Sequence, residues 1–327
     1  MKLSFNQIPR IDENSRRAGV LFKILHRIRY EFRNRWFIKQ GKRFWTDALL
    51  LEYHDLHRKI GSAILAQQPL SVGRLGGVEA SLVMWARGIP KIFLRPDLKP
   101  IFLDTSQGAT NAGIRPRNQE SYCAFAKLAW DALECMDFQG VWKSGQEATV
   151  LQYLKPRALF DVEIAGPDGN YQDHWTSALK GKRTLVVSPF LETINRQIPI
   201  MKFIWPKLDW FEGTQFNVVR FPYLIDEGCE ETWWEVYQRI GSVVFAGDYD
   251  VALFGCGGLG LPFAHLAKEA GRVGIHLGGH LQLLFGIYGQ RHLDHEWHRQ
   301  HINDTWVRPE AVEVPKTASR VEGGCYW

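Results

Sequence analysis

The stretch DYDVALFGCGGLGLPFAHLAKEAGRVGIHLGGH, residues 248–280, decides the fold class of this chain. An apolar run at residues 250–254 leads into the glycine-rich turn GCGGLG at 255–260, and residues 261–270 follow as a predicted helix. A second apolar run at residues 273–276 comes directly after it. Strand, glycine turn, helix and strand in this order are typical of a βαβ unit with parallel strands.

The same alternation recurs earlier in the chain. A short apolar run at residues 70–72 enters the turn VGRLGGVE, residues 72–79, and residues 80–86 continue as a helix. Further strands are predicted at residues 183–190 and 216–221, and helices at residues 48–66 and 230–240. Strands alternating with helices predict an α/β fold of the Rossmann-like type, with a mostly parallel sheet and helices on both faces.

Composition narrows the class of protein. The chain has 327 residues, 45% hydrophobic and 23% charged, which is ordinary for a globular domain and excludes wholesale disorder. No run of 18 apolar residues exists, and the first residues lack the apolar core of a cleaved secretory signal. Five scattered cysteines without a Cys-x-x-Cys pair fit a reducing compartment. We therefore expect a cytoplasmic protein.

Charge divides the chain into a basic segment, residues 1–45, and a domain, residues 46–327. The first carries twelve Lys and Arg against three acidic residues, so the rest of the chain has a net charge of −4. Apolar side chains from Leu21 to Trp36 recur at helical spacing beside basic ones. This pattern indicates either a helix at an anionic membrane surface, through residues 18–45, or a helix packed on its own domain. The acidic domain argues against nucleic acid as a partner.

The turn at residues 72–79 has the composition of a phosphate-binding turn. Gly73, Gly76 and Gly77 let a ligand approach the backbone closely, Arg74 can pair with a diphosphate, and Glu79 can hold a divalent cation or a sugar hydroxyl. The alternative is a tight strand-to-helix turn with an Arg–Glu pair on the surface.

The second turn satisfies Gly-x-Gly-x-x-Gly between a strand and a helix, the context of a dinucleotide fingerprint. The next strand, however, ends without the acidic residue that would bind a ribose, so we expect a phosphate or nucleotide site rather than an NAD site. The residues expected to bind in this part of the chain are Gly255, Gly257, Gly258, Gly260, Gly278, Gly279, His280 and Gln282.

Several segments together resemble the bacterial GT-D-like glycosyltransferases. They are residues 73–79, 250–262, 275–287, 306–309 and 321–327, within a match over roughly residues 60–327. The resemblance implies a GT-D-like fold that uses a nucleotide-sugar donor, with a glycan, lipid-linked or protein acceptor, in the biosynthesis of bacterial surface polysaccharides or glycoconjugates. That family carries Asp-x-Glu in the first turn, whereas this chain has Gly77-Val78-Glu79.

The resemblance also suggests roles for individual residues. Glu79 is the remaining ligand for Mn²⁺ or Mg²⁺. The expected catalytic residues are Glu79, His276 and Asp250, and an inverting transfer would take its base from His276, His280 or Asp250. Asp248-x-Asp250 and Asp161-x-Glu163 are further acidic pairs of metal-binding form. A non-catalytic protein that binds sugar nucleotides or glycans, and an NAD(P)-dependent oxidoreductase, are the alternative functions.

Four histidines recur at every third residue: His292, His295, His298 and His301. On one continuous helix this spacing turns successive side chains around the axis, so only neighbouring pairs could share an ion. We therefore expect a solvated, histidine-rich helix rather than a zinc site.

Overall fold

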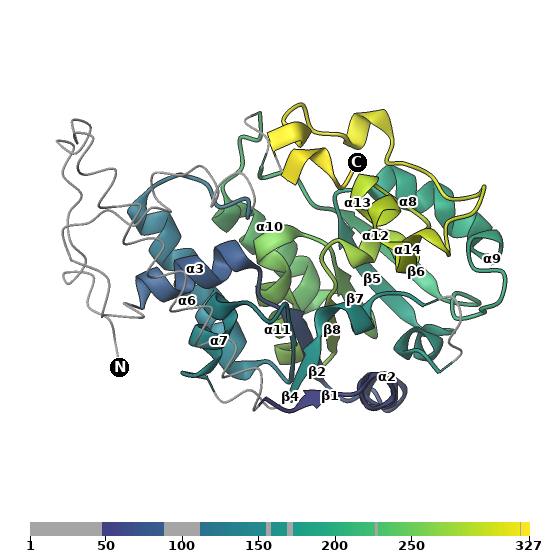
Figure 1. The fold of residues 1–327 in the computed structure, drawn as a ribbon, viewed down its shortest axis with the longest axis horizontal. Coiled ribbons are helices and arrows are strands. Elements are labelled where there is room, and N and C mark those ends of the chain that lie inside the picture. Colours follow the sequence, from purple (N-terminus) through teal and green to yellow (C-terminus); the bar gives the residue numbers. More distant parts are fainter. Residues whose placement is uncertain (1–47, 88–111, 155–157, 169–172, 226–227, 321) are drawn as a thin grey trace.

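The computed structural model describes residues 48–87, 112–154, 158–168, 173–225, 228–320 and 322–327. Their centre is one eight-stranded sheet in the order β1-β4-β3-β2-β8-β7-β5-β6, and every strand pair given by the register is parallel. The α/β, Rossmann-like fold expected from the sequence is therefore confirmed (Figure 1). The strands are β1 (Leu50–Leu51), β2 (Leu70–Arg74), β3 (Phe138–Val141), β4 (Ala158–Asp161), β5 (Arg183–Ser188), β6 (Gln215–Arg220), β7 (Val251–Phe254) and β8 (Val273–His276).

Helices cover both faces of the sheet. The first face carries α3 (Gly77–Ala86), α6 (Gln119–Cys135), α7 (Gly145–Leu151), α10 (Trp233–Ala246) and α11 (Gly260–Glu269). The second carries α2 (Tyr53–Leu65), η4 (Trp175–Leu179), α8 (Leu191–Gln197), α9 (Met201–Ile204) and α12 (His280–Leu284). Two short helices, α13 (Gln290–Asp294) and α14 (Glu296–Arg299), follow α12, and the 3₁₀ turns are η3 (Val162–Ala165), η5 (Ile198–Ile200), η6 (Gly257–Leu259), η7 (Ala311–Glu313), η8 (Ala318–Arg320) and η9 (Glu322–Gly324).

The hydrophobic core is divided by the sheet, and β7 shows how. Ala252 and Phe254 join the core of the first face, whereas Val251 and Leu253 join that of the second. Alternate side chains of a strand point to opposite faces, so a strand covered on both sides must be apolar at every position. This explains the continuous apolar runs of the central strands. Edge strand β6 instead alternates exposed and half-buried residues.

The amino-terminal part departs from the sequence-based expectation. Residues 48–66 were expected to form one helix, but α2 begins only at Tyr53. Leu50 and Leu51 extend the sheet instead, opposite Leu159 and Phe160 of β4. Tertiary pairing with β4 overrides local helix propensity here, because it supplies hydrogen-bond partners at a sheet edge. The basic segment, residues 1–45, lies outside the described residues.

None of the helices in the described ranges combines the length and the apolar character that crossing a bilayer requires.

Candidate functional site

Connections of neighbouring strands leave on different faces of the sheet at β2–β8, at β8–β7 and at β7–β5, and β2–β8 is the central pair of the eight strands. β2 leads into α3 on the first face, while its neighbour β8 leads into α12 on the second. Adjacent strands whose connections leave on opposite faces open a crevice at their carboxyl ends, where ligands of open α/β sheets bind. The β2–β8 edge is therefore the candidate site.

Three glycine-containing turns meet at this edge, after β2, β7 and β8. A Cβ atom on Gly278 would overlap the guanidinium of Arg74, and one on Gly260 would overlap the ring of His276. A Cβ on Gly258 would lie 3.2 Å from Oε1 of Glu79. These glycines let side chains of one turn pack on the backbone of another. We call Arg74, Glu79, His276 and these three turns the glycine-turn site.

Arg74, the last residue of β2, is the cation of this site. Its guanidinium lies against Gly278 and 5.3 Å from the ring centroid of Trp142. Burial lowers the pKa of Arg74 to about 10, and Tyr326 and Glu163 are among the neighbours that oppose this shift. Arg74 therefore stays positively charged at neutral pH.

Glu79 occupies the first turn of α3, where the unpaired backbone N–H groups of the helix favour a carboxylate. Its side chain folds back against Gly76, the residue before the helix, and also reaches Gly258 in the turn after β7. Gly77 is exposed at the helix start, with open space around it. Glu79 thus joins the two glycine turns that the sequence placed 180 residues apart.

His276 ends β8, and its ring lies on the backbone of Gly260 at the start of α11. The imidazole hydrogen-bonds to the backbone of Arg74, and its Nδ1 has no hydrogen-bond partner among the described residues. Burial lowers the pKa of His276 to about 3, so the ring is neutral and a weak base at neutral pH.

Asp250, the other expected base, lies at the opposite edge of the sheet. It precedes β7 at the amino-terminal ends of the strands, where its Oδ1 accepts from Nη2 of Arg183 at 2.9 Å. The Arg183 guanidinium lowers the pKa of Asp250. Asp250 was expected to act as a base beside the glycine turns. These turns follow the carboxyl ends of the strands, whereas Asp250 lies at their amino ends, too far away for that role.

Other expected binding residues serve packing. A Cβ on Gly73 would lie 3.2 Å from Sδ of Met136, and one on Gly255 would lie 2.7 Å from Cδ2 of Leu281. Gly257 has a φ of +55°, which glycine adopts without strain. Close packing at Gly73 and Gly255 and the backbone conformation of Gly257 therefore account for glycine at these three positions without a ligand.

A second group of expected binding residues is covered by the segment at residues 325–327. Nε2 of Gln282 donates to the backbone carbonyl of Tyr326 at 3.2 Å. A Cβ on Gly279 would lie 2.8 Å from Cε1 of the Tyr326 ring, and Arg291 lies 4.8 Å from the centroid of that ring. Tyr326 therefore covers Gly279 and is an electrostatic neighbour of Arg74.

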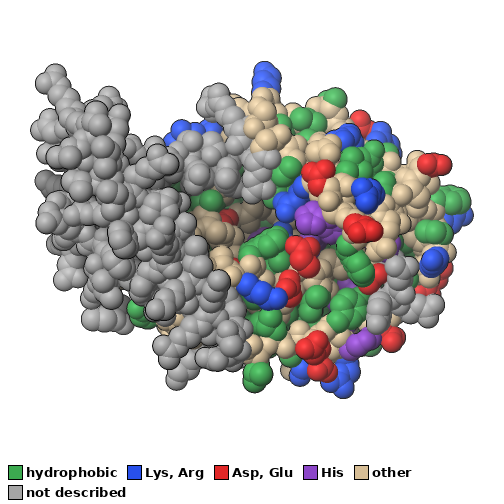
Figure 2. All heavy atoms as spheres, viewed as in Figure 1, with side chains coloured by type: hydrophobic (Ala, Val, Ile, Leu, Met, Phe, Trp, Pro, Cys, Tyr) green, Lys and Arg blue, Asp and Glu red, His purple; other side chains and the backbone are tan. Residues whose placement is uncertain are grey.

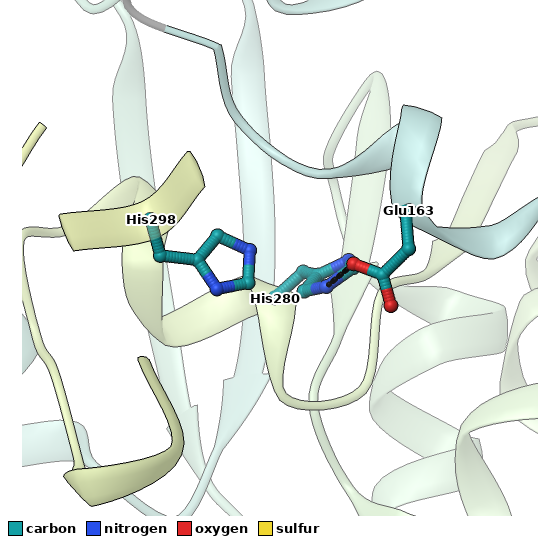
Figure 3. A group of neighbouring side chains, drawn as sticks. All are labelled: Glu163, His280 and His298. Atoms are coloured by element: carbon teal, nitrogen blue, oxygen red, sulfur yellow. Dashed lines mark ion pairs between the residues drawn. The ribbon is translucent and has the colours of Figure 1, made fainter. Parts of the chain in front are cut away.

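His280 belongs to a group that sequence reasoning missed. One ligand-type atom from each of Glu163, His280 and His298 lies within 4.8 Å of the other two (Figure 3). Glu163 lies in η3 after β4, His280 begins α12 after β8, and His298 lies in α14. With His292, whose ring centroid is 5.5 Å from that of His298, they form what we call the histidine cluster.

The predicted solvated histidine helix is wrong. The chain breaks at His295, whose extended backbone (φ −96°, ψ 117°) separates α13 from α14. The break removes the regular turn between successive histidines, so His292 and His298 are both buried and face each other. The Asp161-x-Glu163 pattern at the end of a strand was the one sequence signal for Glu163.

At neutral pH the histidine cluster holds neutral imidazole rings beside an ionised carboxylate. Burial lowers the pKa of His292 to about 3 and that of His298 to about 4, and it also lowers the pKa of His280. The hydrogen bond with His280 lowers the pKa of Glu163 to about 2. Figure 2 shows histidine side chains among basic and acidic ones on one face of the molecule.

Comparisons with protein-family models, with curated proteins and with solved structures found no match to this chain.

Proposed function

We propose that this chain is a glycosyltransferase that binds the diphosphate of a nucleotide-sugar donor at the glycine-turn site. The acceptor would be a glycan, a lipid-linked sugar or a protein, as in the assembly of bacterial surface glycans. The resemblance of the glycine turns and of the carboxyl-terminal segments to GT-D-like enzymes suggests this class, and the geometry of the crevice supports it.

The observation that carries the proposal is the position of Arg74. Its charge is held at the β2–β8 edge between the backbone of Gly278 and the ring of Trp142. A guanidinium held in one orientation can donate two parallel hydrogen bonds to phosphate oxygens. The crevice position and the fixed cation together favour a phosphorylated ligand.

The proposed step breaks the bond between the anomeric carbon and the diphosphate oxygen and forms one to the acceptor oxygen. Negative charge develops on the leaving diphosphate, and Arg74 stabilises it there. The acceptor hydroxyl must lose its proton. We assign this role to Glu79 from its position, because its carboxylate lies between the turns after β2 and β7, whereas Asp250 precedes β7 at the other edge of the sheet.

A metal ion bound at Glu79 has less support than the role proposed for Arg74. In the described part of the chain, Glu79 belongs to no group of three His, Cys, Asp or Glu side chains spaced to share an ion. One carboxylate is a poor match for a protein-built Mn²⁺ or Mg²⁺ site. The proposed step therefore places charge stabilisation on Arg74 and uses no cation at Glu79.

A thermal-unfolding panel tests the proposal, because a ligand that binds the native state raises the melting temperature. The panel contains UDP-, GDP- and dTDP-sugars, the free diphosphates and NAD(P), each with Mn²⁺ and with EDTA. We expect a nucleotide sugar to stabilise the wild type but not Arg74→Ala. Arg58→Ala removes an exposed arginine on α2 and serves as the control. A response to NAD(P) alone, or an equal response in Arg74→Ala, contradicts the proposal.

A non-catalytic sugar-nucleotide-binding protein is the second candidate. The low pKa of His276 and the distant position of Asp250 favour it, since both weaken the case for a base. Release of labelled sugar from the donor that stabilises the protein separates the two candidates. Binding without turnover, with and without added acceptor glycans, supports the second.

The proposal includes contact with an anionic membrane surface through residues 18–45. Sedimentation of the full chain with phosphatidylglycerol vesicles tests this, and binding should weaken as salt is raised. If the protein sediments equally well with neutral phosphatidylcholine vesicles, the proposed contact with an anionic surface is wrong.

A further inference from the structure

We propose that Glu163, His280 and His298 form a binding site for a zinc-like divalent metal ion. The metal site lies next to the glycine-turn site, because His280 directly follows the glycine turn after β8. Binding of a metal ion there requires neither a nucleotide sugar nor a transfer reaction.

The spacing suits a tetrahedral ion. Ligand bonds of about 2.0–2.1 Å place ligand atoms about 3.4 Å apart in a tetrahedron. Nε2 of His280 and Oε2 of Glu163 are already 3.4 Å apart. The hydrogen bond between them is therefore longer than the roughly 2.7–2.9 Å typical of charge-assisted hydrogen bonds. The ligand nitrogen of His298 lies within 4.8 Å of both atoms, so a shift of about 1.4 Å or less brings it to the same spacing.

The ligand set selects the type of metal. Two imidazole nitrogens and one carboxylate oxygen match the His₂Glu sets of zinc sites that keep a fourth position for water or substrate. Mg²⁺ and Ca²⁺ prefer oxygen ligands throughout. The cluster should therefore bind Zn²⁺ or Co²⁺ and not Mg²⁺.

His280 is held in place before any ion binds, whereas the Glu163 side chain is exposed. His280 is buried, and a Cβ on Gly166 would lie 3.1 Å from its Nδ1, so glycine permits the close approach of η3. The carbonyl oxygen of Gly166 in turn accepts a hydrogen bond from Nε2 of buried His174 at 2.9 Å. Ligands fixed by neighbouring residues lose little freedom when an ion binds.

Two buried nitrogens of the histidine cluster have no hydrogen-bond partner among the described residues, Nδ1 of His298 and Nε2 of His292. Gly289 N–H donates to Nδ1 of His292 at 2.9 Å, so Nε2 of His292 carries a proton. It can therefore donate to a water or anion on the metal but cannot itself be a ligand. Buried polar atoms normally have partners, and an ion with its water would supply them.

Nearby positive charge opposes the ion. Arg74 and Arg291 both act electrostatically on His280, and Glu163 supplies one compensating charge. We therefore expect affinity in the micromolar range rather than the picomolar range of closed structural sites.

Titration of the EDTA-treated full chain with ZnCl₂ in a calorimeter tests the proposal. We expect one Zn²⁺ per chain, no heat from MgCl₂, and at least a hundredfold loss of Zn²⁺ affinity in both His298→Ala and Glu163→Gln. His295→Ala is the matched control, because its exposed ring is 5.4 Å from His298 but is not among the three ligands. It should bind Zn²⁺ like the wild type.

Co²⁺ provides a second readout that does not depend on heats of binding. The visible spectrum of the Co²⁺-loaded chain should show the intense bands of four-coordinate Co²⁺, and His298→Ala should lack them. Melting curves without metal establish that each variant is folded. Unchanged Zn²⁺ affinity in folded His298→Ala or Glu163→Gln, or an equal loss in His295→Ala, would overturn the three-ligand site.

Discussion

The glycine-turn site and the histidine cluster lie at the same edge of the sheet, but the chain builds them differently. The glycine-turn site consists of turns that directly follow strands. Arg74 and His276 are the last residues of β2 and β8, so the sheet itself sets their positions. The histidine cluster joins η3, α12 and α14, whose residues are far apart in the sequence. A site built from strand ends is visible in sequence, whereas one built from separate short helices depends on tertiary packing.

The largest expected effect comes from pushing Arg74 away from its turn. Gly278→Val adds a side chain where the guanidinium lies, at a φ of +53°. Overpacking and the unfavourable backbone together should lower the free energy of unfolding by about 4 kcal/mol, measured by urea denaturation.

Gly77→Ala is the matched control, since Gly77 begins α3 with open space around it. Alanine there should leave stability unchanged or raise it slightly. Equal stabilities for the two variants would show that the contact between Arg74 and Gly278 does not organise the glycine-turn site.

The histidine cluster should make stability depend on pH. His298 has its pKa lowered to about 4, so below pH 6.5 the unfolded chain binds a proton that the folded chain does not. Stability should be full above pH 6.5 and fall toward pH 4, with this residue contributing a slope of about 1.4 kcal/mol per pH unit. Urea unfolding in EDTA at several pH values measures it.

His298→Gln removes that titrating group and should make the slope shallower in the same pH window. His295→Gln changes an exposed histidine of the same segment and should leave the slope as in the wild type. If His298→Gln retains the full slope, the acid sensitivity belongs to other groups.

Binding of a nucleotide sugar at the glycine-turn site and of a metal ion at the histidine cluster should be coupled. A diphosphate at Arg74 neutralises the charge that opposes a metal at His280. We expect a nucleotide sugar to tighten Zn²⁺ binding about tenfold, and Zn²⁺ to tighten the sugar nucleotide by the same factor. Paired calorimetric titrations measure both directions. Independent binding would mean that Arg74 and the histidine cluster are electrostatically separate.

The smallest expected effect concerns Trp142, whose ring faces Arg74. Trp142→Leu removes a cation–π contact of about 0.5–1 kcal/mol and should weaken nucleotide-sugar binding a few-fold. Trp234→Leu replaces an exposed tryptophan on α10 as the control. Identical dissociation constants in the two variants would show that Trp142 does not position Arg74.

The parallel α/β sheet could be predicted from the sequence, and so could the position of Arg74, Glu79 and the glycine turns at its carboxyl edge. Apolar runs of strand length and helical segments are local signals, and the carboxyl ends of parallel strands must share one edge. The same rule, applied to residue order within a strand, puts Asp250 at the other edge, because it precedes β7 rather than following it.

The contacts of the remaining residues arise from tertiary packing and could not be predicted from the sequence. The backbone break at His295 turned a regular histidine repeat into two buried, facing rings. Pairing with β4 drew Leu50 and Leu51 into the sheet. Packing placed Tyr326 over Gly279. Contacts between distant segments depend on the packing of the whole domain, and local sequence carries little of that information.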